Sequence, residues 1–286
     1  MTVFKLVHRK VQSAGLVGSV VAATVLLGAG IASAQVSSEE APALSAESTL
    51  TATTWWKPAA RISGQVQLQG TIDTNVDAEV FDIDGFDVPS SKIAALKAKG
   101  RKLVCYFSAG AWEDWRSDAS RWPSSVRGKS NGWPGEKWVD IRQLAALKPI
   151  MATRMDMCKA KGYDAVDPDN VDGYQNDTGF PLKAADQLAF NKMLADLAHE
   201  RGLAIDLKND LDQIAQLADI LDFSVNEQCA EYNECDTLKP FIARNKTVFN
   251  IEHSVSTTKF CPKAKSLGLS PMKKKMALDA WIQRCP

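Results

Sequence analysis

Three aspartates lie within six residues near the middle of the chain, in the stretch AVDPDNVDGYQNDTGF at positions 165–180. Asp167, Asp169 and Asp172 directly follow an apolar pair, and such a group of carboxylates could bind a metal, shape a loop or catalyse. An EF-hand calcium loop needs oxygen ligands at positions 1, 3 and 5 and a glutamate at position 12. Counted from Asp167, position 5 is Val171 and no glutamate stands at position 12, so we favour catalytic and binding carboxylates.

Polar residues also follow other apolar runs of the chain. They are Asp82, Asp84, Glu113, Lys208, Asn209, Glu227 and Glu252. In a barrel of parallel strands, the carboxyl ends of all strands meet at one rim, and that rim carries the chemistry. A single residue of this kind could be a helix cap or a loop ion pair, but the recurrence at successive strand ends favours a site.

Two carboxyl groups that approach one bond from opposite sides can hydrolyse a glycoside. One protonates the leaving oxygen, and the other attacks the anomeric carbon or activates water. Asp169 and Glu227 suit this pair because they end different strands, which we count as the fourth and the sixth.

Short apolar runs alternate with helical patterns from Trp55 onward. The expected strands are 65–69, 79–84, 102–108, 163–169, 203–209, 222–227 and 247–253, and the expected helices are 92–100, 141–162, 182–202 and 211–221. In the helix at 182–202, apolar residues recur with a 3.6-residue period and the pattern ends at Gly202. Strands that are mostly apolar and alternate with helices indicate a parallel sheet covered on both faces.

The predicted fold class is therefore α/β, and either a (β/α)8 TIM-like barrel or a doubly wound sheet fits the pattern. No GxGxxG motif follows the first strand, which counts against a nucleotide-binding sheet, and the length suits a barrel. No regular eighth strand can be assigned after His253, so the sequence leaves open whether the last strand of the barrel is irregular. The basic run at 272–276 is expected to be a solvated helix face.

The N-terminus has the pattern of a secretory signal, with a basic start, an apolar stretch and the cleavage-type sequence ASA. An uncleaved membrane anchor is the alternative. We expect a signal peptide at 1–34, a flexible leader at 35–54 and a single domain at 55–286.

The charge balance argues against a nucleic-acid partner. The chain has 34 basic and 34 acidic residues, and cleavage would remove three basic residues and no acidic one. The remaining protein is mildly acidic, whereas nucleic-acid binding proteins carry basic surfaces. We expect a secreted, extracellular monomer that has no membrane contact after cleavage and needs no cofactor and no metal.

Six cysteines in an exported chain predict disulfides. Fifteen pairings are possible. Cys229 with Cys235, and Cys261 with Cys285, are plausible because they are close in sequence; the two remaining cysteines, Cys105 and Cys158, could form a third disulfide or be buried thiols. A zinc site is disfavoured, since the chain has no CxxC motif.

Five of the eight tryptophans fall within 27 residues, at positions 112, 115, 122, 133 and 138. Flat aromatic faces pack against sugar rings and also attract the ammonium groups of amino sugars. Tryptophans in a core are the alternative. Glycine, serine, asparagine and proline dominate between Pro123 and Pro134, so this part is expected at the surface, where tryptophan favours binding.

Several long motifs make the sequence resemble the endo-α-1,4-polygalactosaminidase family, glycoside hydrolase family 114. In order, they are QVQLQG (65–70), VFDIDGFD (80–87), CYFSAGAWEDWRSDA (105–119), WPGEKWVDIR (133–142), GYDAVDPDNVDGYQNDTGF (162–180), LKND (207–210) and VNEQCAEYNEC (225–235). The resemblance extends from about Trp55 to His253.

The resemblance implies a TIM-like barrel that cleaves α-1,4-linked galactosamine polymers internally, with Asp169 and Glu227 as the catalytic pair. By analogy with α-retaining barrel enzymes, we expect Asp169 to be the nucleophile and Glu227 the general acid/base. Lys208 is expected to pair with Asp167 or Asp169 and to keep the nucleophile ionised.

The substrate would be polycationic, because each deacetylated ring carries an ammonium group. Acidic residues at the strand ends would then make an attractive cleft. The residues expected to bind substrate are Asp82, Asp84, Tyr106, Trp112, Glu113, Asp167, Asn170, Asp172, Lys208, Asn209 and Glu252.

Two other functions remain open at this point. The first is a non-catalytic carbohydrate-binding or matrix protein on the same barrel, and the second is a hydrolase of another amino-sugar polymer. A fold alone does not decide between them.

Overall fold

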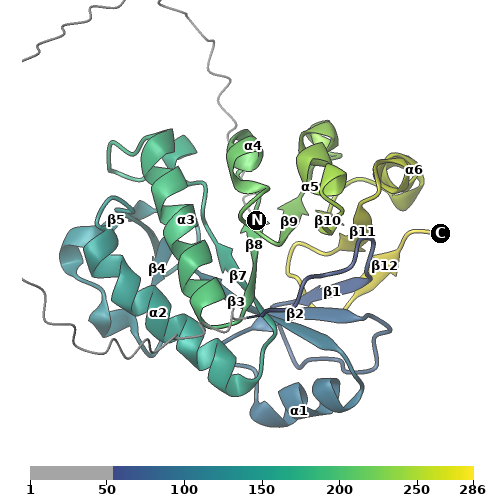
Figure 1. The fold of residues 1–286 in the computed structure, drawn as a ribbon, viewed down its shortest axis with the longest axis horizontal. Coiled ribbons are helices and arrows are strands. Elements are labelled where there is room, and N and C mark those ends of the chain that lie inside the picture. The colour runs from purple at the N-terminus through teal and green to yellow at the C-terminus, as the bar shows by residue number, and fades with distance from the viewer. Residues whose placement is uncertain (1–53) are drawn as a thin grey trace, which may run out of the picture. The chain divides into compact units, whose positions relative to one another are not determined.

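Eight parallel strands form a nearly closed barrel in residues 54–286, which are the residues that this computed structural model describes (Figure 1). The strands, in their order around the barrel, are β1 (Gly64–Gln67), β2 (Val80–Asp84), β3 (Lys102–Ser108), β7 (Ala165–Asp169), β8 (Ala204–Lys208), β9 (Phe223–Glu227), β10 (Val248–Glu252) and β11 (Ser270–Lys274). The expected signal peptide and all but the last residue of the expected leader lie outside the described residues.

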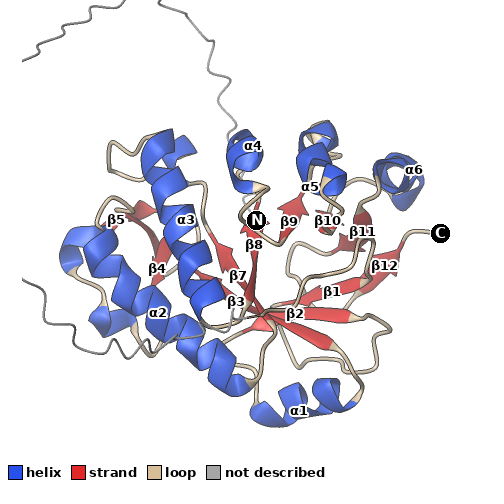
Figure 2. Cartoon of the chain, in the orientation of Figure 1, coloured by secondary structure: helices blue, strands red, loops and turns tan. Residues whose placement is uncertain are grey.

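Helices cover the outside of the barrel (Figure 2). They are α1 (Ser90–Ala98), α2 (Leu144–Lys161), α3 (Ala184–Glu200), α4 (Ile214–Leu217), α5 (Lys239–Ala243) and α6 (Thr257–Leu267). Across residues 54–286, no helix combines the length and the apolar character that crossing a membrane requires. The predicted TIM-like fold is confirmed, and the seven predicted strands agree with the observed ones to within two residues at each end.

The eighth parallel strand is β11, and the expected helix face at 272–276 is wrong. Met272 and Lys274 point into the barrel and are fully buried, which is the alternating pattern of a strand. The ammonium of Lys274 is satisfied internally, because it donates to Gln65 Oε1 (3.1 Å) and to the carbonyl of Asp279 (2.7 Å). The basic composition did not indicate a strand with buried side chains, because charged side chains are rarely buried unless they have such partners.

The irregular part of the barrel is β12 (Ile282–Arg284), which runs antiparallel to β11. Arg284 Nη1 donates to the carbonyl of Gly64 in β1 at 2.6 Å, so this short strand covers the last gap between β11 and β1. The irregular last strand that the sequence left open is therefore β12, which follows the eighth parallel strand.

Side chains along the barrel strands alternate between the interior and the surrounding helices. The lower interior is apolar and contains Val80, Val104, Ala165, Ala204, Phe223 and Phe249, and the face toward the helices contains Phe81, Ile83, Leu103, Phe107, Ile205 and Leu207. This period of two directs the last interior residue of each strand toward the rim, which is how the fold brings distant polar residues together.

A small antiparallel sheet is inserted between β3 and α2. It consists of β4 (Ala111–Glu113), β6 (Glu136–Val139) and β5 (Arg127–Ser130), in that order. The insert carries the tryptophan cluster, whose members divide between core and surface. Trp122 and Trp138 are buried, whereas Trp115 and Trp133 are 51% and 60% exposed.

All six cysteines form disulfides, which are Cys105–Cys158, Cys229–Cys235 and Cys261–Cys285. Both pairs expected from sequence proximity are confirmed. The alternative left open for the third pair is resolved in favour of a disulfide, which links β3 to α2.

A disulfide that closes a longer loop is expected to stabilise the protein more, with a logarithmic dependence on loop length. Loop-closure entropy assigns about 4 kcal/mol to Cys105–Cys158, which spans 53 residues, and about 2 kcal/mol to Cys229–Cys235, which spans 6. Urea unfolding of the two Cys→Ser double variants should reproduce this order. A larger loss for the short loop would contradict the entropic explanation.

Candidate active site

Asp169 and Glu227 lie on the same rim of the barrel, with Lys208 between them. These residues end β7, β9 and β8, which are neighbours in the sheet. Lys208 Nζ lies 3.2 Å from Asp169 Oδ1 and 3.1 Å from Glu227 Oε1. Lys208 therefore forms an ion pair with each of the two carboxylates.

The expected proximity of Asp169 and Glu227 is confirmed. Both contacts are made by the same nitrogen atom of Lys208. The distance between Asp169 Oδ1 and Glu227 Oε1 is therefore at most the sum of the two contact distances, 3.2 Å and 3.1 Å. The predicted ion pair of Lys208 with Asp169 is also confirmed, and the contact with Glu227 adds a second partner.

A tyrosine and a histidine contact the second oxygen of each carboxylate, the one that does not contact Lys208. The hydroxyl of Tyr106 donates to Asp169 Oδ2 at 2.8 Å. His253 Nε2 lies 2.6 Å from Glu227 Oε2, and its Nδ1 lies 3.2 Å from the carbonyl oxygen of Lys274. His253 was not among the predicted site residues, although the seventh expected strand ended there.

The residues that follow the three rim residues share an unusual backbone conformation. Asn170, Asn209 and Gln228 have positive φ values of 61°, 52° and 66°. Left-handed backbone is uncommon outside glycine but is tolerated by asparagine. These turns end the three strands at equivalent places, and Asn209 Oδ1 accepts a hydrogen bond from the backbone N–H of Glu227 at 2.9 Å.

A glycine allows the loop after β3 to pack against the end of β7. The backbone N–H groups of Ala109 and Gly110 donate to the carbonyl of Asp169 at 2.9 and 3.1 Å. A Cβ atom at position 110 would lie 1.7 Å from the carbonyl oxygen of Asn170. Only glycine fits this contact, which fixes the backbone beneath Asp169.

The positive charges at the rim keep Glu227 ionised. Burial raises the pKa of Glu227, but Lys208 and His253 outweigh this effect and lower the pKa to about 2. Burial likewise lowers the pKa of Lys208, and Asp169 and Glu227 raise it well above its ordinary value. Lys208 is therefore a permanent cation at the centre of the rim.

Three aspartates lie beneath Lys208 in the barrel interior, namely Asp82, Asp167 and Asp206. Burial and mutual repulsion raise the pKa of Asp82 and Asp206 well above the ordinary value, and burial also raises the pKa of Asp167. At least one oxygen of each carboxyl is inaccessible, and Asp167 forms side-chain hydrogen bonds with Asp82 and Asp206. The expectation that Asp82 and Asp167 contact substrate is thus corrected, because their carboxyl groups lie below the rim.

Asp84 and Glu113 are bound by an internal arginine. Arg116 donates to Asp84 Oδ2 at 2.7 Å and to Glu113 Oε1 at 2.9 Å, and Arg154 lies 3.7 Å from Glu113 Oε2. Burial raises the pKa of Glu113 to about 7, although Arg116 opposes this effect. Asp84 and Glu113 are therefore engaged by arginines inside the protein, and their predicted contact with substrate stays a prediction.

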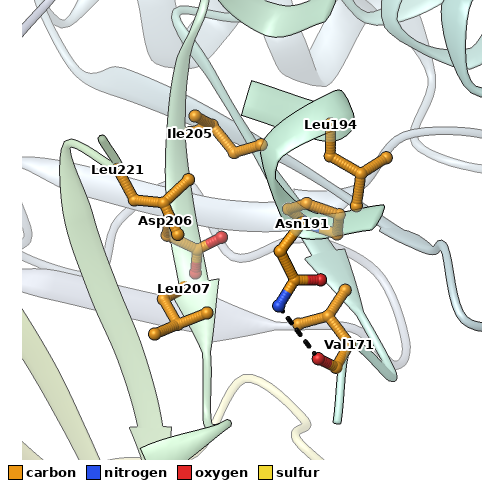
Figure 3. Close-up of a pocket in the computed structure, with 8 residues that line it drawn as sticks. Val171, Asn191, Leu194, Ile205, Asp206, Leu207 and Leu221 are labelled. Atoms are coloured by element: carbon orange, nitrogen blue, oxygen red, sulfur yellow. Dashed lines mark hydrogen bonds between the residues drawn. The ribbon is translucent and has the colours of Figure 1, made fainter. Parts of the chain in front are cut away.

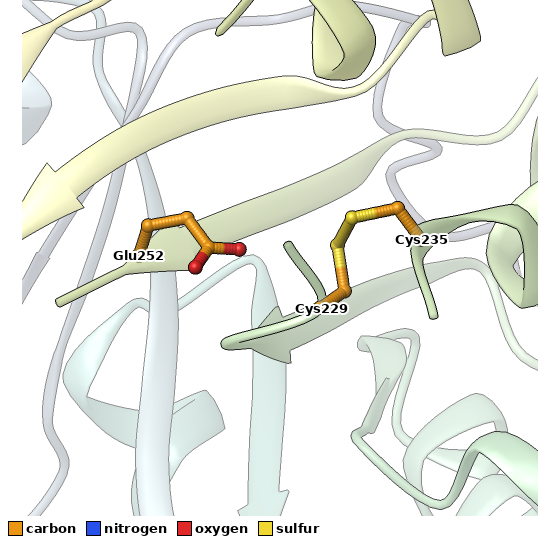
Figure 4. A group of neighbouring side chains, drawn as sticks. All are labelled: Cys229, Cys235 and Glu252. Atoms are coloured by element: carbon orange, nitrogen blue, oxygen red, sulfur yellow. A yellow bond between two sulfur atoms is a disulfide. The ribbon is translucent and has the colours of Figure 1, made fainter. Parts of the chain in front are cut away.

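Glu252 is fully buried and points away from the rim. Its carboxylate accepts hydrogen bonds from Asn250 Nδ2 (3.0 Å) and from the backbone N–H of Ala230 (2.8 Å). Figure 4 shows Glu252 beside the disulfide Cys229–Cys235. Both sulfurs are bonded to each other and cannot act as thiolate ligands, so this group does not form a metal site. The expected contact of Glu252 with substrate is corrected, because the strand alternation turns its side chain outward.

The other predicted binding residues have different surroundings. Trp112 donates to the carbonyl of Ala119 and stacks on Arg127 at 4.4 Å, so much of its ring packs within the protein. Asn170 donates to Ser108 Oγ at 2.9 Å beside the rim. Asp172 is half-buried in the loop that follows β7.

Glu136 is a second candidate site residue that the sequence pattern did not predict. It lies in β6, directly paired with Glu113 of β4, and accepts a hydrogen bond from Asn131 at 2.6 Å. Burial raises the pKa of Glu136; the Asn131 bond opposes this, and the nearby Asp169 raises it further. The insert therefore holds a half-buried carboxylate within electrostatic range of the rim, together with the exposed Trp115 and Trp133.

A small cavity lies outside the barrel between β8 and α3, lined by Val171, Asn191, Leu194 and Ile205 (Figure 3). Asn191 closes it by donating to the carbonyl of Val171 at 3.2 Å. Its volume of about 10 Å³ accommodates about one water molecule and no sugar. A larger cavity of about 260 Å³ lies beside the disulfide Cys229–Cys235 and is lined by Asn233, Phe260 and Lys263, not by Asp169 or Glu227.

Comparisons with known proteins agree with the fold and with the motifs. The family model described as glycoside-hydrolase family GH114 matches residues 45–286. The crystal structure of Ega3 from Aspergillus fumigatus in complex with galactosamine is 44% identical, with a TM-score of 0.77 over 82% of this chain and 98% of that chain.

Two further relatives are more distant. The glycoside hydrolase domain of PelA from Pseudomonas aeruginosa is 12% identical, with a TM-score of 0.60 over 77% of this chain and 96% of that chain, and it supports the fold alone. An uncharacterized protein of Deinococcus radiodurans is 31% identical over 153 residues. That match spans about half the length of the curated relative and 48% of this chain. The family match and the likeness to Ega3 confirm the resemblance, and the chain belongs to glycoside-hydrolase family GH114.

Proposed function

We propose that this protein is a secreted, endo-acting glycoside hydrolase that cleaves α-1,4-linked galactosamine polymers, with Asp169 as the nucleophile and Glu227 as the general acid/base. One observation carries the proposal. The carboxylates that end β7 and β9 face each other across Lys208 on the rim where barrel enzymes carry out chemistry.

In the proposed mechanism, Asp169 attacks the anomeric carbon while the glycosidic bond breaks and Glu227 protonates the leaving oxygen. Water then attacks the anomeric carbon, Glu227 takes its proton, and the bond to Asp169 breaks. The ammonium of Lys208 and the hydroxyl of Tyr106 hold Asp169 as an oriented carboxylate, which suits a nucleophile.

The spacing favours retention of the anomeric configuration. Retaining glycosidases place their carboxyl groups about 5–5.5 Å apart, and inverting ones about 6.5–9.5 Å apart, to leave room for a water molecule. Both carboxylates contact the same nitrogen of Lys208, so their nearest oxygens are held close together, as we propose for a retaining enzyme.

The substrate class and the location rest on the family and on chemical context. Ega3 was solved with galactosamine, and its identity of 44% to this chain is high for a change of substrate class. Disulfides are typical of proteins in oxidising compartments, and three of them here agree with export through a signal peptide at 1–34.

Glu136 would recognise the ammonium group of a sugar bound beside the catalytic pair. Replacement by glutamine removes one negative charge and retains the shape, so we expect kcat/KM for deacetylated oligosaccharide to fall about fivefold, which corresponds to ~1 kcal/mol. The value for the fully acetylated substrate should stay unchanged. Initial rates on the two substrates measure this difference.

Asp177→Asn is the matched control, because it removes the same charge from an exposed ion pair with Lys129 of the same insert. It should leave both rates unchanged. An equal loss on both substrates in Glu136→Gln would remove the assigned role in amine recognition.

Product analysis on partly deacetylated α-1,4-galactosaminan tests the function itself. An endo-acting hydrolase should release oligosaccharides of mixed length, with new reducing ends that carry the α configuration. A non-catalytic carbohydrate-binding protein is the alternative on the same barrel. Binding of the polymer without any new reducing ends would favour that alternative.

A further inference from the structure

The contact between His253 and Glu227 has a consequence for the proton that the general acid must deliver. A carbonyl oxygen can only accept a hydrogen bond, so His253 Nδ1 must carry the hydrogen that points to the carbonyl of Lys274 (3.2 Å). In the neutral ring, Nε2 then has a lone pair and no hydrogen. Yet Nε2 lies 2.6 Å from Glu227 Oε2, which is a hydrogen-bond distance.

This short contact requires one proton between the two atoms. Either the imidazole is protonated and Glu227 is ionised, or the imidazole is neutral and Glu227 carries the proton. A neutral ring facing an ionised carboxylate would place two lone pairs 2.6 Å apart. The geometry therefore describes a pair that stores a single proton.

We propose that His253 supplies and holds the proton that Glu227 delivers to the leaving glycosidic oxygen, and that the backbone carbonyl of Lys274 fixes the required tautomer. His253 is thus a positioning residue that acts through Glu227. The inference rests on the proposed hydrolase function and deepens it.

The proposal resolves a conflict within the site. A general acid must carry a proton, but Lys208, which contacts Glu227 Oε1, favours the ionised form of this carboxylate. The proton shared with His253 is available on the other oxygen, Oε2. Burial lowers the pKa of His253, but Glu227 on β9, the carbonyl of Lys274 and Glu252 on β10 raise it above its ordinary value and favour a protonated ring. On β8, the ammonium of Lys208 contacts Glu227 Oε1, not the Oε2 that His253 faces. On β11, the ammonium of Lys274 donates hydrogen bonds to Gln65 in β1 and to the carbonyl of Asp279, not to the imidazole of His253.

The proton and electron balance is complete without any further reactant. In the first step, the shared proton passes through Glu227 Oε2 to the glycosidic oxygen, which keeps the electron pair of the broken C–O bond. Asp169 supplies the electron pair of the new bond. The pair is left as a neutral imidazole and an ionised carboxylate. In the second step, attacking water returns one proton to the pair, and the bond to Asp169 breaks.

His253→Gln tests the proposal, because an amide N–H can donate to Glu227 but cannot ionise. In the wild type, the alkaline limb of the kcat/KM profile should lie above the ordinary histidine value of about 6.5. In the variant, Glu227 must hold the proton alone, so the limb should move down by at least about one pH unit. Cleavage of polymer at pH 7 should fall about 10²-fold, while an aryl galactosaminide with a good leaving group should lose less than about fivefold, since it needs little protonation.

His199→Gln is the matched control. His199 makes a similar contact with Asp222 (2.9 Å) far from the rim and stacks on Trp55. Its pH profile should equal that of the wild type. A uniform loss in His253→Gln, at every pH and on both substrates, would overturn the proposal and assign a purely structural role.

A second measurement does not depend on activity. Nitrogen-15 NMR of the imidazoles should show that neutral His253 carries its proton on Nδ1, with a pKa above about 6.5 that falls in Glu227→Gln. The opposite tautomer, or a His253 pKa that is the same in the wild type and in Glu227→Gln, would overturn the inference. Sugar release by the wild type would still support the hydrolase function. If the NMR result is as expected but the wild type releases no sugar, the hydrolase function fails and the proton-storing pair remains.

Discussion

Asp169→Asn should reduce sugar release from α-1,4-galactosaminan by at least about 10⁴-fold, a rise of ~5 kcal/mol in the activation barrier. Asparagine has nearly the same shape as aspartate but cannot form the covalent glycosyl intermediate. It can still accept the hydrogen bond from Tyr106, so the fold should survive. Reducing-end assays measure the activity, and thermal unfolding verifies that the structure is kept.

Azide rescue assigns the roles of the two carboxylates. In Asp169→Ala, azide can attack from the face that Asp169 vacates and give a β-glycosyl azide from an aryl α-galactosaminide. In Glu227→Ala, the intermediate on Asp169 still forms, and azide attacks from the opposite face to give the α product. If the two products are exchanged, Glu227 is the nucleophile. If Asp169→Asn keeps near-normal activity, the proposed two-carboxylate mechanism is wrong.

Lys208→Met should destabilise the protein at pH 7 by about 3–5 kcal/mol, because it leaves Asp169 and Glu227 facing each other without their shared cation. Activity should fall on the order of 10²-fold, since the ammonium no longer orients the nucleophile. Urea unfolding measures the stability loss, and initial rates measure the activity.

The stability loss should shrink as the pH falls. In the wild type, the pKa of Glu227 is lowered to about 2, so its stabilising contribution is complete above the unfolded value of about 4.3 and is lost as the pH falls toward 2. In Lys208→Met, the carboxylates repel each other when ionised, and protonation relieves this repulsion. Both effects make the variant approach the wild type in acid.

Lys148→Met is the control for this prediction, because Lys148 is exposed on α2 and the substitution changes the same charge. Its stability should differ from that of the wild type by less than about 0.5 kcal/mol at any pH. A Lys208→Met variant whose deficit stays constant as the pH falls from 7 toward 2 would show that lost packing, and not charge, causes the destabilisation.

Local patterns made the fold predictable. The apolar run of β3, the 3.6-residue period of α3 and the glycine that ends α2 each depend on near neighbours in the sequence. The rule that parallel strands end at one rim predicts that Asp169 and Glu227 lie close together, and the structure agrees. By contrast, β11 was missed because burial of Lys274 depends on partners in β1 and beyond the strand.

The sequence by itself determined the α/β class, two of the three disulfides and the family, because strand periodicity, cysteine spacing and ordered motifs are properties of the chain. Only the tertiary structure decided which carboxylates are available. Arg116 forms ion pairs with Asp84 and Glu113, while Asp82 and Asp167 lie beneath the rim. His253 became a candidate only when its ring met Glu227, 26 positions away. Charge compensation and burial depend on contacts between distant segments, so a list of acidic residues could not predict them.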